Sequence, residues 1–175
     1  MHATAELLDR NASFVAGFEH EGLGPEPSLR VAIVACMDAR LDVARALGLS
    51  SGEAHVIRNA GGVVTDDVIR SLAISQQLLG TREIVLVHHA ACGMASIDDD
   101  AFAGQLESRT GSRPDWTAGG FADPRTSVAA SMAKLVADPF VEHDGAIRGF
   151  VYDLVSGRLD EVTDDTFVLC MGDDR

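Results

Sequence analysis

Two short segments of the chain carry side chains that can bind a metal ion and transfer protons. The first is Cys36-Met-Asp-Ala-Arg40 and the second is His89-Ala-Ala-Cys92. Two thiolates and one imidazole form a ligand set that zinc favours, and three protein ligands leave one coordination position open, as catalytic zinc sites require. The sequence therefore predicts one zinc ion per chain, held by Cys36, His89 and Cys92.

An acid–base pair lies within the first segment. Asp38 and Arg40 are two residues apart, so they can share one side of the chain and form an ion pair, although an ordinary salt bridge has the same spacing. Next to a metal, the Asp38 carboxylate could fill the fourth coordination position, or it could accept a hydrogen bond from metal-bound water. Arg40 would hold it in the second role. We predict that both residues are catalytic.

Three other residues of similar chemistry have simpler interpretations. His88 precedes His89 on a predicted strand, where neighbouring side chains point to opposite faces, so a core position or a contact with a ligand fits it better than coordination. His55 is interpreted as a strand-edge residue, with proton transfer as the alternative. Cys170 is interpreted as a free thiol without a role.

Strands and helices alternate along the chain. Apolar or alternating runs predict strands at 31–35, 54–57, 84–87, 148–155 and 158–162. Helices are expected within 3–18, at 41–47, between Thr65 and Gly80 and at 127–136, and the polar stretch 96–124 is expected to mix short helix with loop. This order predicts an α/β fold with a mainly parallel sheet flanked by helices and a C-terminal antiparallel hairpin strand.

Both metal-binding segments follow predicted strands. In parallel sheets, ligands bind beyond the carboxyl ends of the strands, and Cys36 and His89 both fall at such an end. The position of these residues therefore agrees with their chemistry.

Length, charge and cysteine content limit the class of protein. The 175 residues favour one domain with a sizeable core. With 27 acidic and 14 basic side chains the formal charge is −13, which argues against a nucleic acid or an anionic membrane as partner. The sequence lacks a membrane-spanning run and a signal-peptide pattern, and three cysteines, two of them in the motifs, argue against a disulfide framework. We predict a cytoplasmic protein.

Three signatures, in the same order, resemble those of the β-class carbonic anhydrases, most closely the small bacterial members. They are Cys36-x-Asp38-x-Arg40, the loop from Val56 to Gly61, and His89-x-x-Cys92-Gly93. The helix that begins at Thr65 is also similar, and the resemblance covers nearly the whole chain. It implies zinc on Cys36, His89 and Cys92 and an Asp38–Arg40 dyad. The residues implied to line the site are Asn59, Ala60, Gly61, Gly62 and Gly93.

The resemblance also implies an organisation for the whole chain. Residues 1–175 form a single domain, in which 1–28 are an N-terminal helical arm with its loop and 164–175 are a C-terminal tail. The arm is expected to pack on a neighbouring copy, so the smallest unit is a homodimer, with a dimer of dimers as the alternative. One departure from the resembled pattern is Ala90-Ala91, where small members often carry a polar pair; this affects rate or substrate preference rather than zinc binding.

The implied reaction is the reversible hydration of carbon dioxide to bicarbonate and a proton. Zinc lowers the pKa of bound water from about 16 to about 7, and the zinc-bound hydroxide attacks carbon dioxide. The nearest alternative is hydrolysis of carbonyl sulfide or carbon disulfide, which are linear molecules that the same hydroxide could attack. The motifs alone do not separate these substrates.

Two further interpretations explain fewer residues. A cysteine phosphatase or rhodanese would use Cys36 as the nucleophile and Arg40 as the anion binder, but the loop between them is short and contains an aspartate. It also leaves His89 and Cys92 without a role. A non-catalytic zinc-binding module leaves the open coordination position and the Asp38–Arg40 pair unexplained.

Overall fold

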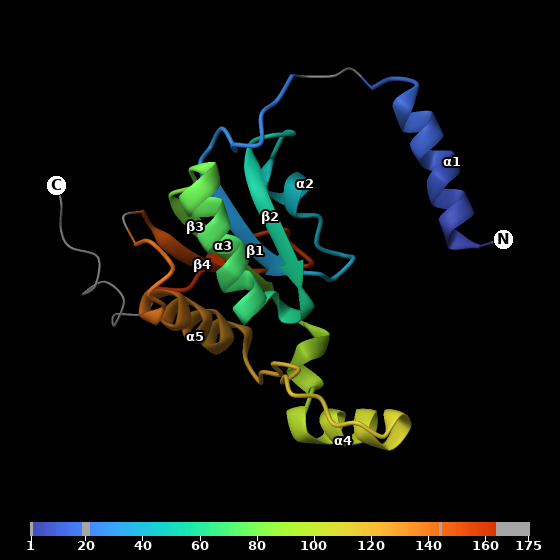
Figure 1. The fold of residues 1–175 in the computed structure, drawn as a ribbon, viewed down its shortest axis with the longest axis vertical. Helices are drawn as coiled ribbons and strands as arrows, with labels where there is room; N and C mark the ends of the chain where they lie inside the picture. The colour runs from blue at the N-terminus through green and yellow to red at the C-terminus, as the bar shows by residue number, and fades with distance from the viewer. Residues whose placement is uncertain (1, 19–21, 144, 164–175) are drawn as a thin grey trace.

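The fold is organised around a five-stranded sheet with the strand order β2-β1-β3-β4-β5 (Figure 1). The computed structural model describes residues 2–18, 22–143 and 145–163. The strands are β1 (Val31–Cys36), β2 (Ala54–Asn59), β3 (Glu83–His89), β4 (Ile147–Tyr152) and β5 (Leu159–Glu161). Strands β1 to β4 are parallel to their neighbours and β5 is antiparallel to β4, which confirms the predicted sheet.

The described ranges contain the helices α1 (Ala3–Val15), α2 (Val43–Leu47), α3 (Asp66–Leu79), α4 (Asp99–Thr110) and α5 (Pro124–Ala137), with two short 3-10 helices, η1 (Ala60–Gly62) and η2 (Gly93–Ser96). Helices α2, α3 and α5 flank the sheet. Helices α3 and α5 pack against the same hydrophobic cluster on one face. Figure 1 shows α3 in front of the strands and α5 below them. The segment that contains α2 packs on the other face.

Two hydrophobic clusters lie on opposite faces of the sheet because β1 and β3 are apolar on both sides. The cluster under α3 and α5 includes Leu72, Leu86 and Leu135. The second cluster includes Ile33, Leu41 and Val87, and it also contains Cys36 and Cys92. The predicted ligand sulfurs therefore belong to a packed core at the end of the sheet, and their positions are fixed by that packing.

Helix α4 is longer than the sequence indicates. It has 12 residues within the stretch where short helix and loop were expected. None of its residues is buried, so it has no apolar stripe from which a helix could be predicted. Its N-terminus is fixed by Asp98, whose carboxylate accepts a hydrogen bond from Ala101 N at 2.8 Å.

Other boundaries differ by a few residues because of capping side chains. Helix α2 begins at Val43 rather than residue 41, because Asp42 caps it by accepting from Arg45 N at 3.1 Å. Helix α5 begins at Pro124 rather than residue 127, after Asp123 accepts from Thr126 N at 2.8 Å. Proline is suited to the first turn of a helix because its missing N–H would have no partner there.

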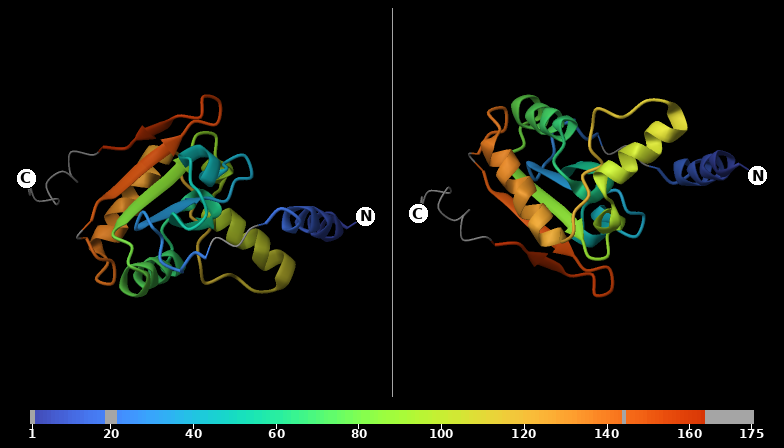
Figure 2. Two further views of the ribbon diagram at one scale, coloured as in Figure 1. Left: turned by 90° about the horizontal axis from the view of Figure 1, so that it is seen from above. Right: turned by 90° about the horizontal axis from the view of Figure 1, so that it is seen from below.

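Helix α1 stands apart from the sheet in all three views (Figures 1 and 2). None of its residues is buried, and Leu7, Leu8 and Phe14 are 61%, 64% and 62% exposed. No helix in the described ranges is long and apolar enough to cross a membrane. The single domain over 1–175 stays a prediction, and the predicted tail 164–175, with Cys170, lies outside the described residues.

Candidate metal centre

The metal-binding side chains meet where β1 and β3 end. These strands are parallel neighbours, with Ala35 opposite Val87, so Cys36 and His89 emerge at the same edge of the sheet. The chain then turns through Ala91, which has a φ of 53°, and this turn brings Cys92 back toward Cys36. The two sulfurs are 3.9 Å apart and His89 Nε2 is 3.2 Å from Cys36 Sγ.

The geometry of this cluster fits a tetrahedral zinc ion. All three ligand atoms lie within 4.8 Å of one another, and all three residues are buried. Tetrahedral bonds of about 2.3 Å to sulfur and about 2.0 Å to nitrogen require edges of about 3.8 Å between two sulfurs and about 3.5 Å between nitrogen and sulfur. The separation of the two sulfurs, 3.9 Å, and that of His89 Nε2 from Cys36 Sγ, 3.2 Å, are close to these values.

The hydrogen bond made by Nδ1 of His89 leaves its Nε2 free to bind a metal. His89 Nδ1 lies 2.9 Å from its acceptor, Ala90 O. This contact assigns the proton to Nδ1 and leaves the lone pair of Nε2 directed toward the sulfurs, as a metal-ligating histidine requires.

The two thiols favour a cation between them. Burial raises the pKa of the Cys92 thiol, and the nearby Cys36 sulfur raises it further. Two thiolates this close would repel each other in the interior of the protein. A divalent cation removes that repulsion and stabilises both thiolates, so the donor set fits a bound metal better than two free anions.

Asp38 and Arg40 form the ion pair that their spacing predicted. Arg40 Nε donates to Asp38 Oδ1 at 2.9 Å, Arg40 Nη2 donates to Oδ2 at 2.6 Å, and the main-chain N of Arg40 donates to Oδ1 at 2.9 Å. These hydrogen bonds from Arg40 hold the pKa of Asp38 well below its usual range. Asp38 Oδ2 is also 3.6 Å from His89 Nε2, so an ionised carboxylate lies beside the ligand cluster.

The glycine loop after β2 presses against the end of β1. A Cβ atom on Gly62, whose φ is 74°, would lie 2.8 Å from Cys36 N and 3.0 Å from Ala35 C. His88 Nε2 donates to Gly62 O at 3.0 Å, and burial lowers the pKa of His88 to about 4. His88 is therefore a neutral, buried residue that supports this loop, in agreement with its sequence interpretation.

The other residues expected to line the site occupy this loop and the start of η2. Asn59 Nδ2 donates to Val63 O at 2.8 Å, and Ala60, Gly61 and Gly62 form η1. Gly93 begins η2. Asn59 and Ala60 also line a cavity of about 420 Å³ whose other walls are Val63, Thr65, Met94, Ile97, Phe102, Trp116, Thr117 and Ala118.

Sequence reasoning did not assign a role to Arg58, which contacts the site, and His55 lies apart from the site. Arg58 donates hydrogen bonds to the main-chain oxygens of Cys36 and Asp38, a role that its place in the Val56–Gly61 signature did not reveal. His55 contacts Ser75 Oγ and the main-chain oxygen of Pro25, which agrees with a structural role at the sheet edge.

Comparison with known proteins identifies similar chains. A family model described as carbonic anhydrase matches residues 31–118, which include all three candidate ligands. The β-carbonic anhydrase 1 of Mycobacterium tuberculosis (strain H37Rv) is 52% identical over 163 residues, which are 93% of this chain and 99% of that protein. A crystal structure of carbonic anhydrase from Streptococcus mutans matches with a TM-score of 0.85 and 43% identity, covering 93% of this chain and 99% of that one.

A partial match extends to a different activity. A carbon disulfide hydrolase of Acidithiobacillus thiooxidans is 44% identical over 89 residues. The match covers 50% of this chain and 45% of that protein.

Proposed function

Since the chain is an enzyme of the β-carbonic anhydrase family, we propose that it catalyses the zinc-dependent, reversible hydration of carbon dioxide to bicarbonate and a proton. One observation carries this proposal. The buried donor cluster of Cys36, His89 and Cys92 lies next to a carboxylate whose Oδ2 is 3.6 Å from His89 Nε2. A donor group able to hold a metal therefore lies beside a hydrogen-bond acceptor, which supports the proposal, because hydration needs both.

In this proposal, Cys36, His89 and Cys92 hold one zinc ion per chain. Zinc, when bound, would lower the pKa of a water to about 7 and supply a nucleophile near neutral pH. The Asp38 carboxylate would accept a hydrogen bond from this nucleophile and so set the direction from which it attacks carbon dioxide. Arg40 holds that carboxylate in its ionised form, and the guanidinium keeps it from moving freely toward the ligands.

We propose that the glycine loop and the start of η2 shape the entrance to this site. The residues concerned are Asn59, Ala60, Gly61, Gly62 and Gly93. Support comes from the close approach of Gly62 to Cys36 and from the position of Gly93 directly after Cys92.

Stopped-flow hydration of carbon dioxide, with protein of measured zinc content, tests the proposal. The rate above buffer should increase in proportion to zinc occupancy and should disappear after chelation. Zinc-loaded, folded protein that gives no rate above buffer would contradict it.

Hydrolysis of carbon disulfide or carbonyl sulfide is the second candidate. The partial match to a carbon disulfide hydrolase favours it, because that similarity covers half of this chain. The two activities can share a metal site, since function depends on the details of the pocket rather than on the fold. Hydrogen sulfide release from each sulfur substrate, measured beside carbon dioxide hydration on one zinc-loaded sample, separates the candidates by their kcat/KM values.

We propose a homodimer, with a dimer of dimers as the alternative assembly. The support is α1, whose apolar side chains are exposed in the single chain, because such surfaces are usually covered by a partner. Light scattering should give at least twice the chain mass. A monomer that keeps full activity at the assay concentration would contradict the proposal.

We also propose a cytoplasmic location, with neither nucleic acid nor membrane as a partner. Free Cys36 and Cys92 suit a reducing compartment, and the net charge of −13 disfavours polyanionic partners.

A further inference from the structure

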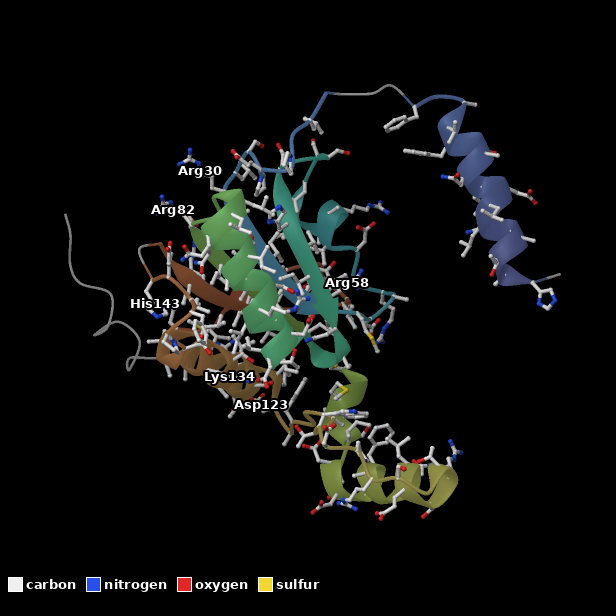
Figure 3. The ribbon with its side chains drawn as sticks, in the orientation of Figure 1. Arg30, Arg58, Arg82, Asp123, Lys134 and His143 are labelled. Carbon is white, nitrogen blue, oxygen red and sulfur yellow. The ribbon has the colours of Figure 1, made fainter. Side chains whose placement is uncertain are left out.

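Arg58 binds the main chain of the first metal-binding loop. It lies near the end of β2, opposite Ala35 in the ladder with β1, and Figure 3 labels it beside that strand. Its Nε and Nη2 donate to Cys36 O at 3.0 and 2.8 Å, and Nη2 also donates to Asp38 O at 2.8 Å. Within the described residues, all side-chain hydrogen bonds of Arg58 go to these two oxygens, so its guanidinium holds main chain rather than a carboxylate.

The two acceptors belong to the residues on which the loop's chemistry depends. Cys36 supplies a candidate ligand, and Asp38 supplies the carboxylate. Asp38 O also accepts from Leu41 N at 3.0 Å, which closes the turn after β1. A planar guanidinium holds its donors in a fixed geometry, so Arg58 fixes the separation of the two carbonyls and thereby the direction in which the Asp38 side chain leaves the loop.

Arg40 cannot provide the same restraint. Arg40 and Asp38 lie in one short loop, and their hydrogen bonds would persist if the loop moved as a unit. Arg58 comes from a neighbouring strand and therefore ties the loop to the sheet. Among the described residues, two other hydrogen bonds join the loop to its surroundings. Met37 N donates to Asn59 O at 2.8 Å, and Arg40 Nη2 donates to Ala91 O at 3.3 Å. Neither of them holds a carbonyl oxygen of Cys36 or Asp38.

We propose that Arg58 is a positioning residue for catalysis, which sets the orientation of the Asp38 carboxylate relative to the metal ligands. This inference rests on the proposed function of the same site. It predicts that loss of Arg58 impairs the chemical step more than it impairs metal binding, because a displacement of about 1 Å can reduce a rate by about 100-fold.

The test compares Arg58→Ala and Arg58→Lys with Arg70→Ala, which removes an exposed arginine that pairs with Asp67 on α3. Zinc content, kcat, KM and the visible absorption spectrum of the cobalt-substituted protein are measured. Arg58→Ala should keep about one zinc per chain, with kcat lowered about 10- to 100-fold, little change in KM and an altered cobalt spectrum. Arg58→Lys should recover part of kcat, because an ammonium group can still donate to both carbonyls, and Arg70→Ala should match the parent.

A parental kcat with an unchanged cobalt spectrum in Arg58→Ala would overturn the inference. If Arg58→Ala does not fold, Arg58→Lys decides: a zinc-loaded variant with lowered kcat supports the inference, and one with parental kcat overturns it. If the parent itself does not hydrate carbon dioxide, the proposed function fails. The cobalt spectrum then still tests whether Arg58 positions the loop, because an altered spectrum supports that role and an unchanged one rejects it.

Discussion

The loop after β1 and the loop after β3 supply the candidate metal ligands, and they are held in different ways. Side chains fix the first loop. Arg40 donates to both carboxylate oxygens of Asp38, while Arg58 donates to the main-chain oxygens of Cys36 and Asp38. Charge-assisted hydrogen bonds of this kind are short and directional, so the first loop is built to orient a carboxylate.

The second loop is held through its own main-chain atoms. Ala90 N donates to Tyr152 O at 2.9 Å, and Ala90 O accepts from His89 Nδ1. The side chains of Ala90 and Ala91 contribute no hydrogen bonds, and Arg40 reaches this loop only at Ala91 O. The two loops therefore have different roles: the second loop presents two candidate ligands, whereas the first presents one ligand together with the acid–base pair.

The largest expected effect is the loss of a ligand from either loop. Cys36→Ser, His89→Ala and Cys92→Ser should each lose most of the bound zinc and all measurable hydration, because three protein ligands leave no redundancy. Metal analysis of the purified variants checks this, with Cys170→Ser as a control that should match the parent. Retention of one zinc per chain by Cys92→Ser would show that the second loop does not supply a sulfur ligand.

Removal of Arg40 should separate zinc binding by the first loop from its part in catalysis. Arg40→Ala should be folded, should keep a nearly normal zinc content and should be nearly inactive, because the freed Asp38 carboxylate can then move onto the metal. Stability should fall only slightly, since the Arg40 side chain is 59% exposed. Steady-state hydration and metal analysis check this. Arg113→Ala is the control, because Arg113 pairs with Asp100 and Glu107 of α4 and not with any candidate site residue. A parental rate in Arg40→Ala would show that the Asp38–Arg40 pair has no catalytic role.

The same pair determines one feature of the pH profile. Asp38 has a pKa held well below its usual range by Arg40, so it stays ionised from mildly acidic to alkaline pH. Parental activity should increase through mildly alkaline pH, because the nucleophile that zinc would supply is the deprotonated form of water. The titration of Asp38 should contribute nothing to that increase. An activity midpoint near the ordinary aspartate pKa of about 4 would contradict this account.

Gly62 should show how tightly the glycine loop packs on the first loop. Gly62→Ala combines the strain of a left-handed residue with a Cβ atom 2.8 Å from Cys36 N, so the free energy of unfolding should fall by about 3 kcal/mol. Gly80→Ala is the matched control: its φ is 73° and nothing lies within 4 Å of the added Cβ, so only the strain of about 1 kcal/mol should appear. Equal losses in the two variants by urea unfolding would show that the contact at Cys36 is unimportant.

The smallest expected effect concerns the turn in the second loop. Ala91 has a φ of 53°, which glycine adopts more easily than alanine. Ala91→Gly should relieve this strain, partly offset by greater freedom in the unfolded chain, for a net gain of about 0.5 kcal/mol. Zinc content should not change. A clear loss of stability in urea unfolding would show that Ala91 is not strained.

The sequence predicts the ligand cluster better than it predicts the residues that support it. Cys36 and His89 could be placed together because each follows an apolar strand, and parallel strands end at the same edge of a sheet. The role of Arg58 could not be predicted, because its partners are main-chain carbonyl oxygens. Every residue has such an oxygen, so the sequence does not reveal which ones a side chain binds. Similarly, α4 has no buried face, so its length was not readable from hydrophobic periodicity.

X-ray absorption at the zinc edge of the purified protein would identify the ligands, because it reports the atoms bound to the metal. We expect two sulfur neighbours at about 2.3 Å, one imidazole nitrogen at about 2.0 Å and one further light-atom ligand. A zinc ion surrounded by four sulfurs, or by nitrogen and oxygen alone, would contradict a site shared between Cys36 on one loop and His89 and Cys92 on the other.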